Sequence, residues 1–140
     1  HIAYYAEYNA QNILFCGDTL FGAGCGRLFE GTPAQMFNSL QKLAVLPQFS
    51  KVYCTHEYTM HNINFALTLE PDNHALIKRY ETTLALRNRQ QPSLPSTIAL
   101  ELATNPFLRC HTNAIHASIQ RLNATSLEVF TTIRELRNHY

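Results

Sequence analysis

The 140-residue sequence lacks tryptophan, has only two methionines, and confines its five glycines to residues 17–31. It has no apolar run near the roughly 20 residues that a membrane-spanning helix needs, so we expect no membrane partner. A charge excess is also missing, because 11 Lys and Arg against 10 Asp and Glu give a net charge of +1. This balance argues against a nucleic-acid partner. At 46% hydrophobic residues the chain can form a packed core.

The cysteine pattern excludes two kinds of stabilised small domain. Cys16, Cys25, Cys54 and Cys110 form no Cys-x-x-C pair, so a cysteine zinc knuckle is not expected. A chain this apolar does not need disulfides to fold. We interpret the four thiols as reduced and mostly buried, which favours a cytoplasmic location.

The first half of the chain predicts strands and one helix. Residues 2–8 and 12–16 are short and rich in Tyr, Ile and Phe, which indicates a hairpin. The glycines predict a loop with special backbone angles over residues 17–31. A capping box at Thr32, followed by proline, predicts a helix start. Residues 51–55 predict a brief strand.

The second half predicts helices. Apolar residues recur at helical spacing in the segments 63–67, 76–84, 115–122 and 129–133, the last after an expected cap at Ser126. This half also carries eight of the 11 basic residues. A negatively charged partner is therefore expected to bind there.

Three candidate metal ligands lie at strand ends or in loops: His1, Asp18 and His56. Asp18 follows a strand and a glycine, which lets the backbone turn and directs the carboxylate away from the sheet. Carboxylate and imidazole suit zinc, iron or manganese, and an Asp between two His fits half of a two-metal centre. Taken singly, each residue fits a structural role better, since Asp in a glycine-rich turn more often stabilises the turn and a lone His is more often structural.

Six short motifs occur along the chain. In order they are Cys-Gly-Asp-Thr-Leu-Phe (16–21), Ala-Gly-Cys-Gly-Arg (23–27), Phe-Glu-Gly-Thr (29–32), His-Glu-Tyr-Thr (56–59), Pro-Ser-Thr (95–97) and Asn-Pro-Phe-Leu-Arg (105–109). With them, the chain resembles glyoxalase II, the hydroxyacylglutathione hydrolase family of the metallo-β-lactamase superfamily. The resemblance covers essentially all 140 residues.

The resemblance implies an α+β fold in two parts. Residues 1–58 would be the C-terminal half of an αββα metallo-β-lactamase sandwich, and residues 59–140 a small all-α glutathione-binding domain. The chain begins at His1 without Met, directly in a strand-like run. We therefore expect the N-terminal half of the same protein to be missing, and we expect the intact protein to be a monomer.

The resemblance also implies two divalent metal ions, zinc first, with iron or manganese as alternatives. His1 and His56 would be ligands, and Asp18 would bridge the ions and so take part in catalysis. The family's other ligands belong to a Thr-His-x-His-x-Asp-His motif, which this sequence lacks. Thr55 stands where the family often has Gly before the ligand His.

Glutathione-binding positions carry over in the same way to Arg27, Phe29, Tyr58, Arg134 and Arg137. Phe29 stands where many members have Tyr. The last two arginines share one helical face, and guanidinium groups bind carboxylates in a bidentate fork. Without the resemblance, solvated surface charge is the preferred interpretation of the pair.

The function implied for the parent protein is hydrolysis of S-D-lactoylglutathione and related 2-hydroxyacyl-glutathione thioesters to glutathione and D-lactate. We expect the 140-residue chain alone to be inactive. One alternative is a non-catalytic module that binds glutathione conjugates. Another is a different hydrolase of the same superfamily.

Overall fold

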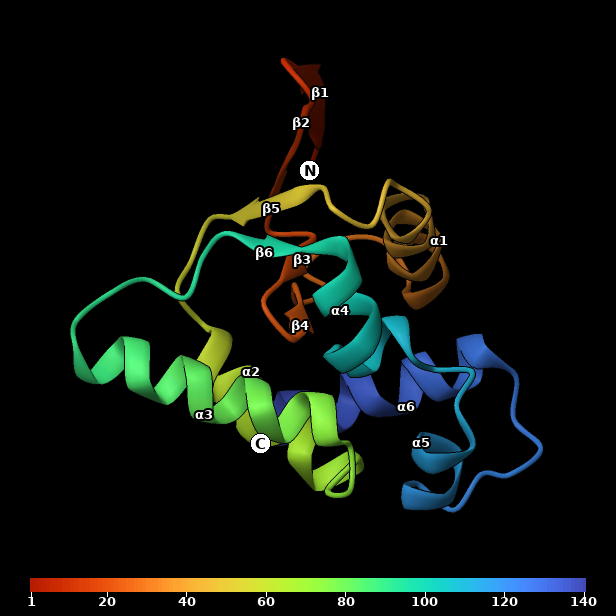
Figure 1. Cartoon of the computed structure of the whole chain (residues 1–140). Coiled ribbons are helices and arrows are strands. Elements are labelled where there is room, and N and C mark those ends of the chain that lie inside the picture. Colours follow the sequence, from red (N-terminus) through yellow and green to blue (C-terminus); the bar gives the residue numbers. More distant parts are fainter.

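The computed structural model describes residues 1–140 and contains six strands and six α-helices. Four strands form one sheet in the order β1-β2-β5-β6, and the other two form a separate small hairpin. In the view of Figure 1, the first helix lies beside the sheet, and the other helices lie below it. The predicted α+β class is confirmed.

The predicted N-terminal hairpin is present. Strand β1 (Tyr4–Tyr8) pairs antiparallel with β2 (Gln11–Gly17). Asn9 and Ala10 connect them with φ of 48° and 59°, as a two-residue turn that matches strand twist requires. The hairpin projects from the body, and most of β1 is exposed (Figure 1).

A helix connects two parallel strands of the sheet. Helix α1 (Pro33–Ala44) begins with the predicted capping box at Thr32. It leads into β5 (Lys51–Cys54), which pairs parallel with β2. Strand β6 (Ser96–Thr97) then adds antiparallel to β5. The sequence analysis did not predict β6, because a strand of two residues has no periodicity of its own.

The glycine-rich segment is more ordered than the predicted loop. It contains the small hairpin of β3 (Leu20–Phe21) and β4 (Gly24–Cys25). The turn between them contains Ala23, a non-glycine residue with φ of 54°. The prediction of special backbone angles is confirmed at Gly17, with φ of 53°, but the prediction of a loop throughout was wrong.

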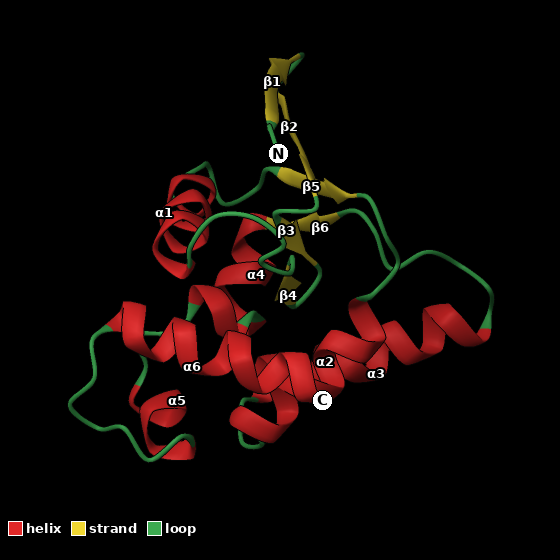
Figure 2. Cartoon of the chain, turned by 180° about the vertical axis from the view of Figure 1, so that it is seen from behind, coloured by secondary structure: helices red, strands yellow, loops and turns green.

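Helices α2 (Thr59–Leu69) and α3 (His74–Asn88) lie side by side in both views (Figures 1 and 2). Both helices were predicted, but the buried face of α3 differs from the predicted apolar one. Ile77 and Leu84 are 37% and 39% exposed, whereas Arg79 is buried. Arg79 is buried because its guanidinium belongs to a buried polar cluster.

The chain ends in three further helices: α4 (Ile98–Thr104), α5 (Asn113–Ser118) and α6 (Ser126–His139). A single 3-10 turn, η1 (Pro106–Leu108), separates the first two. Helix α4 was not predicted. The cap of α6 is Thr125 rather than the predicted Ser126, because the Thr125 hydroxyl accepts from the Glu128 amide.

The larger of two apolar clusters runs between sheet and helices. It includes Leu14 and Val52 from the strands together with Phe107, Ile115 and Phe130 from the C-terminal segments. The core therefore contains residues from both sides of position 58. None of the helices combines the length and apolar character needed to cross a membrane.

Candidate functional site

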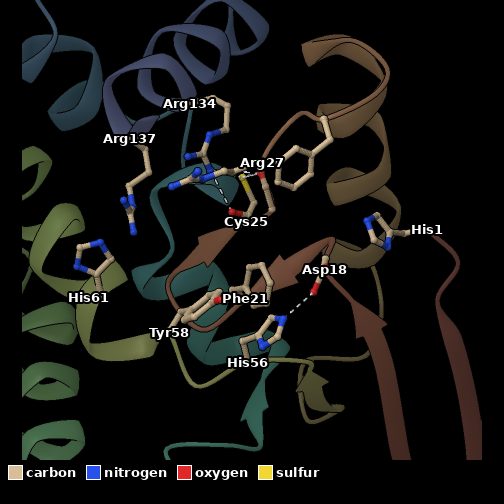
Figure 3. A pocket seen from close by; sticks show the side chains of 12 residues that line it. His1, Asp18, Phe21, Cys25, Arg27, His56, Tyr58, His61, Arg134 and Arg137 are labelled. Carbon is tan, nitrogen blue, oxygen red and sulfur yellow. Dashed lines mark hydrogen bonds and ion pairs between the residues drawn. The ribbon is translucent and has the colours of Figure 1, made fainter. Parts of the chain in front are cut away.

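One cavity of about 540 Å³ gathers all eight residues that the sequence analysis singled out. Four others join them: Phe21, Cys25, Gly26 and His61. The twelve lining residues are His1, Asp18, Phe21, Cys25, Gly26, Arg27, Phe29, His56, Tyr58, His61, Arg134 and Arg137. Figure 3 shows the arginines toward one end and the Asp18–His56 pair toward the other.

The sheet explains why Asp18 and His56 meet. Asp18 follows β2 and His56 lies two residues after β5, and these strands are parallel neighbours with Gly17 paired to Cys54. The carboxyl ends of parallel strands share one edge of the sheet, where ligand sites commonly form. His56 Nε2 consequently lies 3.8 Å from Asp18 Oδ1.

Aromatic rings support the His56 imidazole. Tyr58 stacks on it with ring centroids 4.9 Å apart and an interplanar angle of 23°. Phe21 contacts both rings, with centroids 6.1 Å from His56 and 5.3 Å from Tyr58. The three rings fix the direction in which the imidazole nitrogen faces, which is toward Asp18.

The donors of this chain fit part of a metal site. His1 lines the same cavity as Asp18 and His56. Even so, no three His, Cys, Asp or Glu side chains come close enough to hold an ion together. A carboxylate and an imidazole are suitable ligands for zinc, iron or manganese. A zinc site normally takes four ligands, so the chain supplies only part of the ligand set of such a site.

Arg134 is turned into the protein. It is 4% exposed, and its Nη1 donates to Cys25 O at 3.0 Å and to Gly26 O at 3.3 Å. Its Nη2 donates to Asn138 Oδ1 at 3.2 Å, and its guanidinium lies 5.3 Å from the Phe107 ring centroid. These contacts hold the part of the cavity wall that strand β4 forms. Arg134 Nε has no hydrogen-bond partner.

Arg137 is held differently. Its Nη2 donates to Asn62 Oδ1 at 3.2 Å. The guanidinium lies 5.7 Å and 5.8 Å from the ring centroids of Phe65 and Tyr140. Cations over aromatic faces are attracted by the ring quadrupole. The Arg137 guanidinium therefore faces the cavity while it lies over two aromatic rings.

The arginine end of the cavity is electropositive. The pKa of Arg137 is lowered, first by burial and then by the nearby charges of Arg134 and Arg27. The pKa of His61 is lowered as well, by burial and by Arg137. Burial is the larger cause of both shifts, and the neighbouring positive charges add to it, since like charges disfavour each other's ionised form. An anionic ligand would relieve that repulsion.

Buried side chains from the helices hold the turn between β3 and β4. Glu101 Oε2 accepts from the Ala23 amide at 2.9 Å. Asn105 Nδ2 donates to Phe21 O at 3.2 Å and to Gly24 O at 2.9 Å. The turn carries Phe21 into the cavity wall, so the helical part determines where this wall lies.

The glycines of this segment allow close approach. A Cβ atom at Gly22 would collide with the side chain of Thr59, and one at Gly24 would collide with that of Asn62. At Gly26 a Cβ would collide with the backbone carbonyl of Asp18, which cannot move away as a side chain can. The glycine-rich segment is therefore packed tightly against α2 and the Asp18 loop.

Of the lining residues that were not predicted, Phe21, Cys25 and Gly26 belong to motifs quoted above. His61 had no signal as a histidine; it lies in the first turn of α2, three residues after Tyr58, which precedes the helix. Asn62 and Glu101 had none, because a single polar residue in a helix does not reveal its partners. The cavity brings the predicted residues together, while their roles as ligands stay predictions.

Comparison with known proteins gives one consistent result. Residues 57–140 match the family model described as "Hydroxyacylglutathione hydrolase C-terminus". A protein of Methylobacillus flagellatus named hydroxyacylglutathione hydrolase is 59% identical over 140 residues, which is all of this chain and 54% of that relative. Relatives of the same name from Pseudomonas aeruginosa and Thermosynechococcus vestitus are 53% and 51% identical.

Each of these two also matches the whole chain, over 55% and 54% of its own length. The chain thus spans about half the length of the curated relatives it matches.

Proposed function

The chain belongs to the hydroxyacylglutathione hydrolase C-terminus family, and from this premise we propose that it is the substrate-binding part of a glutathione thioesterase. The whole protein would hydrolyse S-D-lactoylglutathione and related 2-hydroxyacyl-glutathione thioesters to glutathione and D-lactate. Relatives at 51–59% identity carry the name hydroxyacylglutathione hydrolase.

The observation that carries the proposal is the polarity of the cavity. Arg27 and Arg137 face one end, and the Asp18–His56 pair faces the other. Glutathione has two carboxylates remote from its sulfur, and guanidinium groups are the preferred partners of carboxylates. A glutathione thioester bound by the arginines would extend its acyl group toward Asp18 and His56.

His1, Asp18 and His56 would hold divalent metal ions, zinc first, with iron or manganese as alternatives. Such ions supply Lewis acidity and activation of water near neutral pH. The remaining ligands would come from a segment outside the 140 residues, since these contribute too few donors. In this arrangement Tyr58 and Phe21 orient the His56 imidazole, and Arg134 braces the wall behind the substrate.

The same proposal covers the fold of the whole protein, its cellular location and its oligomeric state. The strand–helix–strand unit and the projecting hairpin would form the C-terminal half of an αββα metallo-β-lactamase sandwich. The exposed β1 would then contact the other half of the same chain. The helical segments that follow would be the glutathione-binding domain. Four free cysteines suit a cytoplasmic location, and the intact protein would act as a monomer.

Calorimetry with S-methylglutathione tests the binding half of the proposal. We expect the 140-residue chain to bind this ligand, and Arg27→Gln and Arg137→Gln each to weaken binding at least tenfold, the scale for a lost charge pair. Arg89→Gln, at an exposed position away from the cavity, is the matched control. Equal affinity in all four proteins would refute the assignment of the cavity.

A thioester assay with S-D-lactoylglutathione tests the catalytic half. With added zinc, iron or manganese, we expect the 140-residue chain to show no efficient turnover. The same residues within a polypeptide of the relatives' length should be active. Efficient turnover by the short chain would refute our view that it lacks essential ligands.

A second candidate is a non-catalytic module that binds glutathione conjugates. The incomplete set of metal ligands favours this alternative, because the arginines that line the cavity need no metal ion to bind a carboxylate. S-methylglutathione binding that survives chelator treatment, together with an inactive full-length polypeptide, would select this alternative.

A further inference from the structure

Asn62 lies between two parts of the cavity wall. It is on α2 and is 6% exposed. Its Nδ2 donates to Gly22 O at 3.1 Å, in the turn between β3 and β4. Its Oδ1 accepts from Arg137 Nη2 at 3.2 Å, on α6. One side-chain amide therefore links three segments that are far apart in the sequence.

The chemistry of the partners fixes the orientation of this amide. A guanidinium has only donors and a backbone carbonyl only accepts. Rotating the Asn62 amide by 180° would place its NH2 group against Arg137 and its oxygen against Gly22 O. Both contacts would then be repulsive, so a single orientation satisfies the site.

The position of Arg137 depends on its hydrogen bond to Asn62 more than the position of Arg134 depends on any one of its hydrogen bonds. The Arg134 guanidinium has several hydrogen-bond acceptors in the protein, whereas the bond to Asn62 is the only hydrogen bond of the Arg137 guanidinium. The nearby cations Arg134 and Arg27 repel Arg137. The aromatic rings beneath it attract the cation but do not fix its rotation.

We propose that Asn62 is a positioning residue that holds the Arg137 guanidinium on the cavity wall, ready for a carboxylate of the ligand. This rests on the proposed function of the cavity. Because the same amide binds Gly22 O, it also fixes Arg137 relative to the glycine-rich segment that carries Arg27. The spacing between the two arginines would then be set before ligand arrives, which reduces the entropy lost on binding.

The first test measures Arg137 in the absence of ligand. The side-chain 1H–15Nε signal of Arg137, with its heteronuclear NOE, reports whether the guanidinium is ordered. We expect Arg137 to be ordered in the unmodified chain, and we expect Asn62→Leu, which is similar in volume and lacks polar atoms, to abolish that order. Asn62→Asp should preserve it although the bond to Gly22 O is lost, because a charged carboxylate accepts from the Arg137 guanidinium more strongly than an amide does. An equally ordered Arg137 in Asn62→Leu would overturn the proposal.

The second test measures S-methylglutathione affinity in a double-mutant cycle with Arg137→Gln. We expect Asn62→Leu to weaken binding about tenfold, the scale for a lost bond to a charged group, and to add little in the Arg137→Gln background. Asn62→Asp should weaken binding although Arg137 stays ordered, since its charge neutralises the guanidinium. Fully additive effects would show that Asn62 acts independently of Arg137 and would overturn the proposal.

Asn73→Ala is the control for general destabilisation. Asn73 caps α3 by accepting from the Leu76 amide and also donates to Ala103 O, away from the cavity. It should lower stability while leaving Arg137 order and affinity unchanged. If the unmodified chain binds no S-methylglutathione, the proposed function fails, and the Arg137 signal still decides whether Asn62 positions that side chain.

Discussion

The Thr55 hydroxyl donates a hydrogen bond to Asp18 Oδ1, the same oxygen that lies 3.8 Å from His56 Nε2. Thr55 stands where glycine is common in the resembling family, and glycine offers no donor. The departure therefore adds a contact that holds the Asp18 carboxylate. In the proposed metal site this bond would orient Asp18, since groups that hydrogen-bond to metal ligands orient them and raise metal affinity.

Thr55→Val removes the hydroxyl and retains the branched shape. In a polypeptide of the relatives' length, where the proposed metal site would have its other ligands, we expect the apparent affinity for Zn²⁺, measured by competition with a chromogenic chelator, to fall about tenfold. Thr82→Val is the matched control, because the Thr82 hydroxyl bonds only to Lys78 O on the exposed side of α3. An unchanged zinc affinity in Thr55→Val would show that Asp18 is not oriented by this bond.

The buried ion pair of Arg79 and Glu101 gives a stability prediction. Arg79 Nη2 lies 2.6 Å from Glu101 Oε1, and the two side chains are 4% and 0% exposed. Glu101→Gln leaves the Arg79 charge buried without its counter-charge, which should lower the free energy of unfolding by about 3 kcal/mol. Urea denaturation measures the change.

Glu135→Gln is the control for that substitution. Glu135 pairs with His139 on the exposed face of α6, with both side chains mostly exposed. Its loss should change the free energy of unfolding by less than about 0.5 kcal/mol. A similar small change in Glu101→Gln would mean that water reaches Arg79. Because Glu101 also binds the Ala23 amide, S-methylglutathione affinity should fall together with stability.

Local signals in the sequence were sufficient for part of the fold. The capping box at Thr32 and the hairpin at Asn9 and Ala10 depend on neighbouring residues alone, so the pattern determines them. Helices α2 and α3 were likewise predicted from periodicity. The cap of α6 was misplaced by one residue because Thr125 and Ser126 are both good caps.

Features that depend on distant partners could not be predicted. Strand β6 is defined only by its pairing with β5. Charged residues are expected at the surface, so Arg79 and Glu101 gave no sign of being buried together. Five of the eight predicted site residues lie in the quoted motifs, and the resemblance supplied the other three, His1, Arg134 and Arg137. Asn62 belongs to none of the motifs and acts through contacts on two other segments.

The capping box of α6 predicts a pH dependence. The pKa of Glu128 is lowered, chiefly by hydrogen bonds from the amide and hydroxyl of Thr125. A lowered pKa in the folded state means that this contact stabilises the fold fully above the pKa of an unfolded glutamate. The stabilisation is lost as pH falls through the lowered folded value.

Glu128→Gln keeps a side-chain acceptor for the Thr125 amide but has no carboxylate to titrate. Thermal unfolding between pH 6 and pH 3 should therefore show a smaller loss of stability in Glu128→Gln than in the unmodified chain. Identical pH profiles would mean that the Thr125–Glu128 bonds do not persist in solution.

The four thiols should differ sharply in reactivity. Burial raises the pKa of Cys16 and Cys110 to about 12 and that of Cys25 to about 11. Burial also raises the pKa of Cys54, which is only half-buried. Since the thiolate is the reactive form, iodoacetamide at pH 8 should label Cys54 first and the other three only after unfolding.

Peptide mapping by mass spectrometry measures the order of labelling, with urea-unfolded protein as the reference in which all four thiols react alike. Cys25 is the informative case, because it lines the cavity beside Arg134 and yet stays protonated. Oxidised glutathione should therefore leave it unmodified, even though its peptide carboxylates match the arginines. Rapid labelling of Cys25 in the folded chain would instead mean that β4 opens and that the wall of the cavity is not rigid.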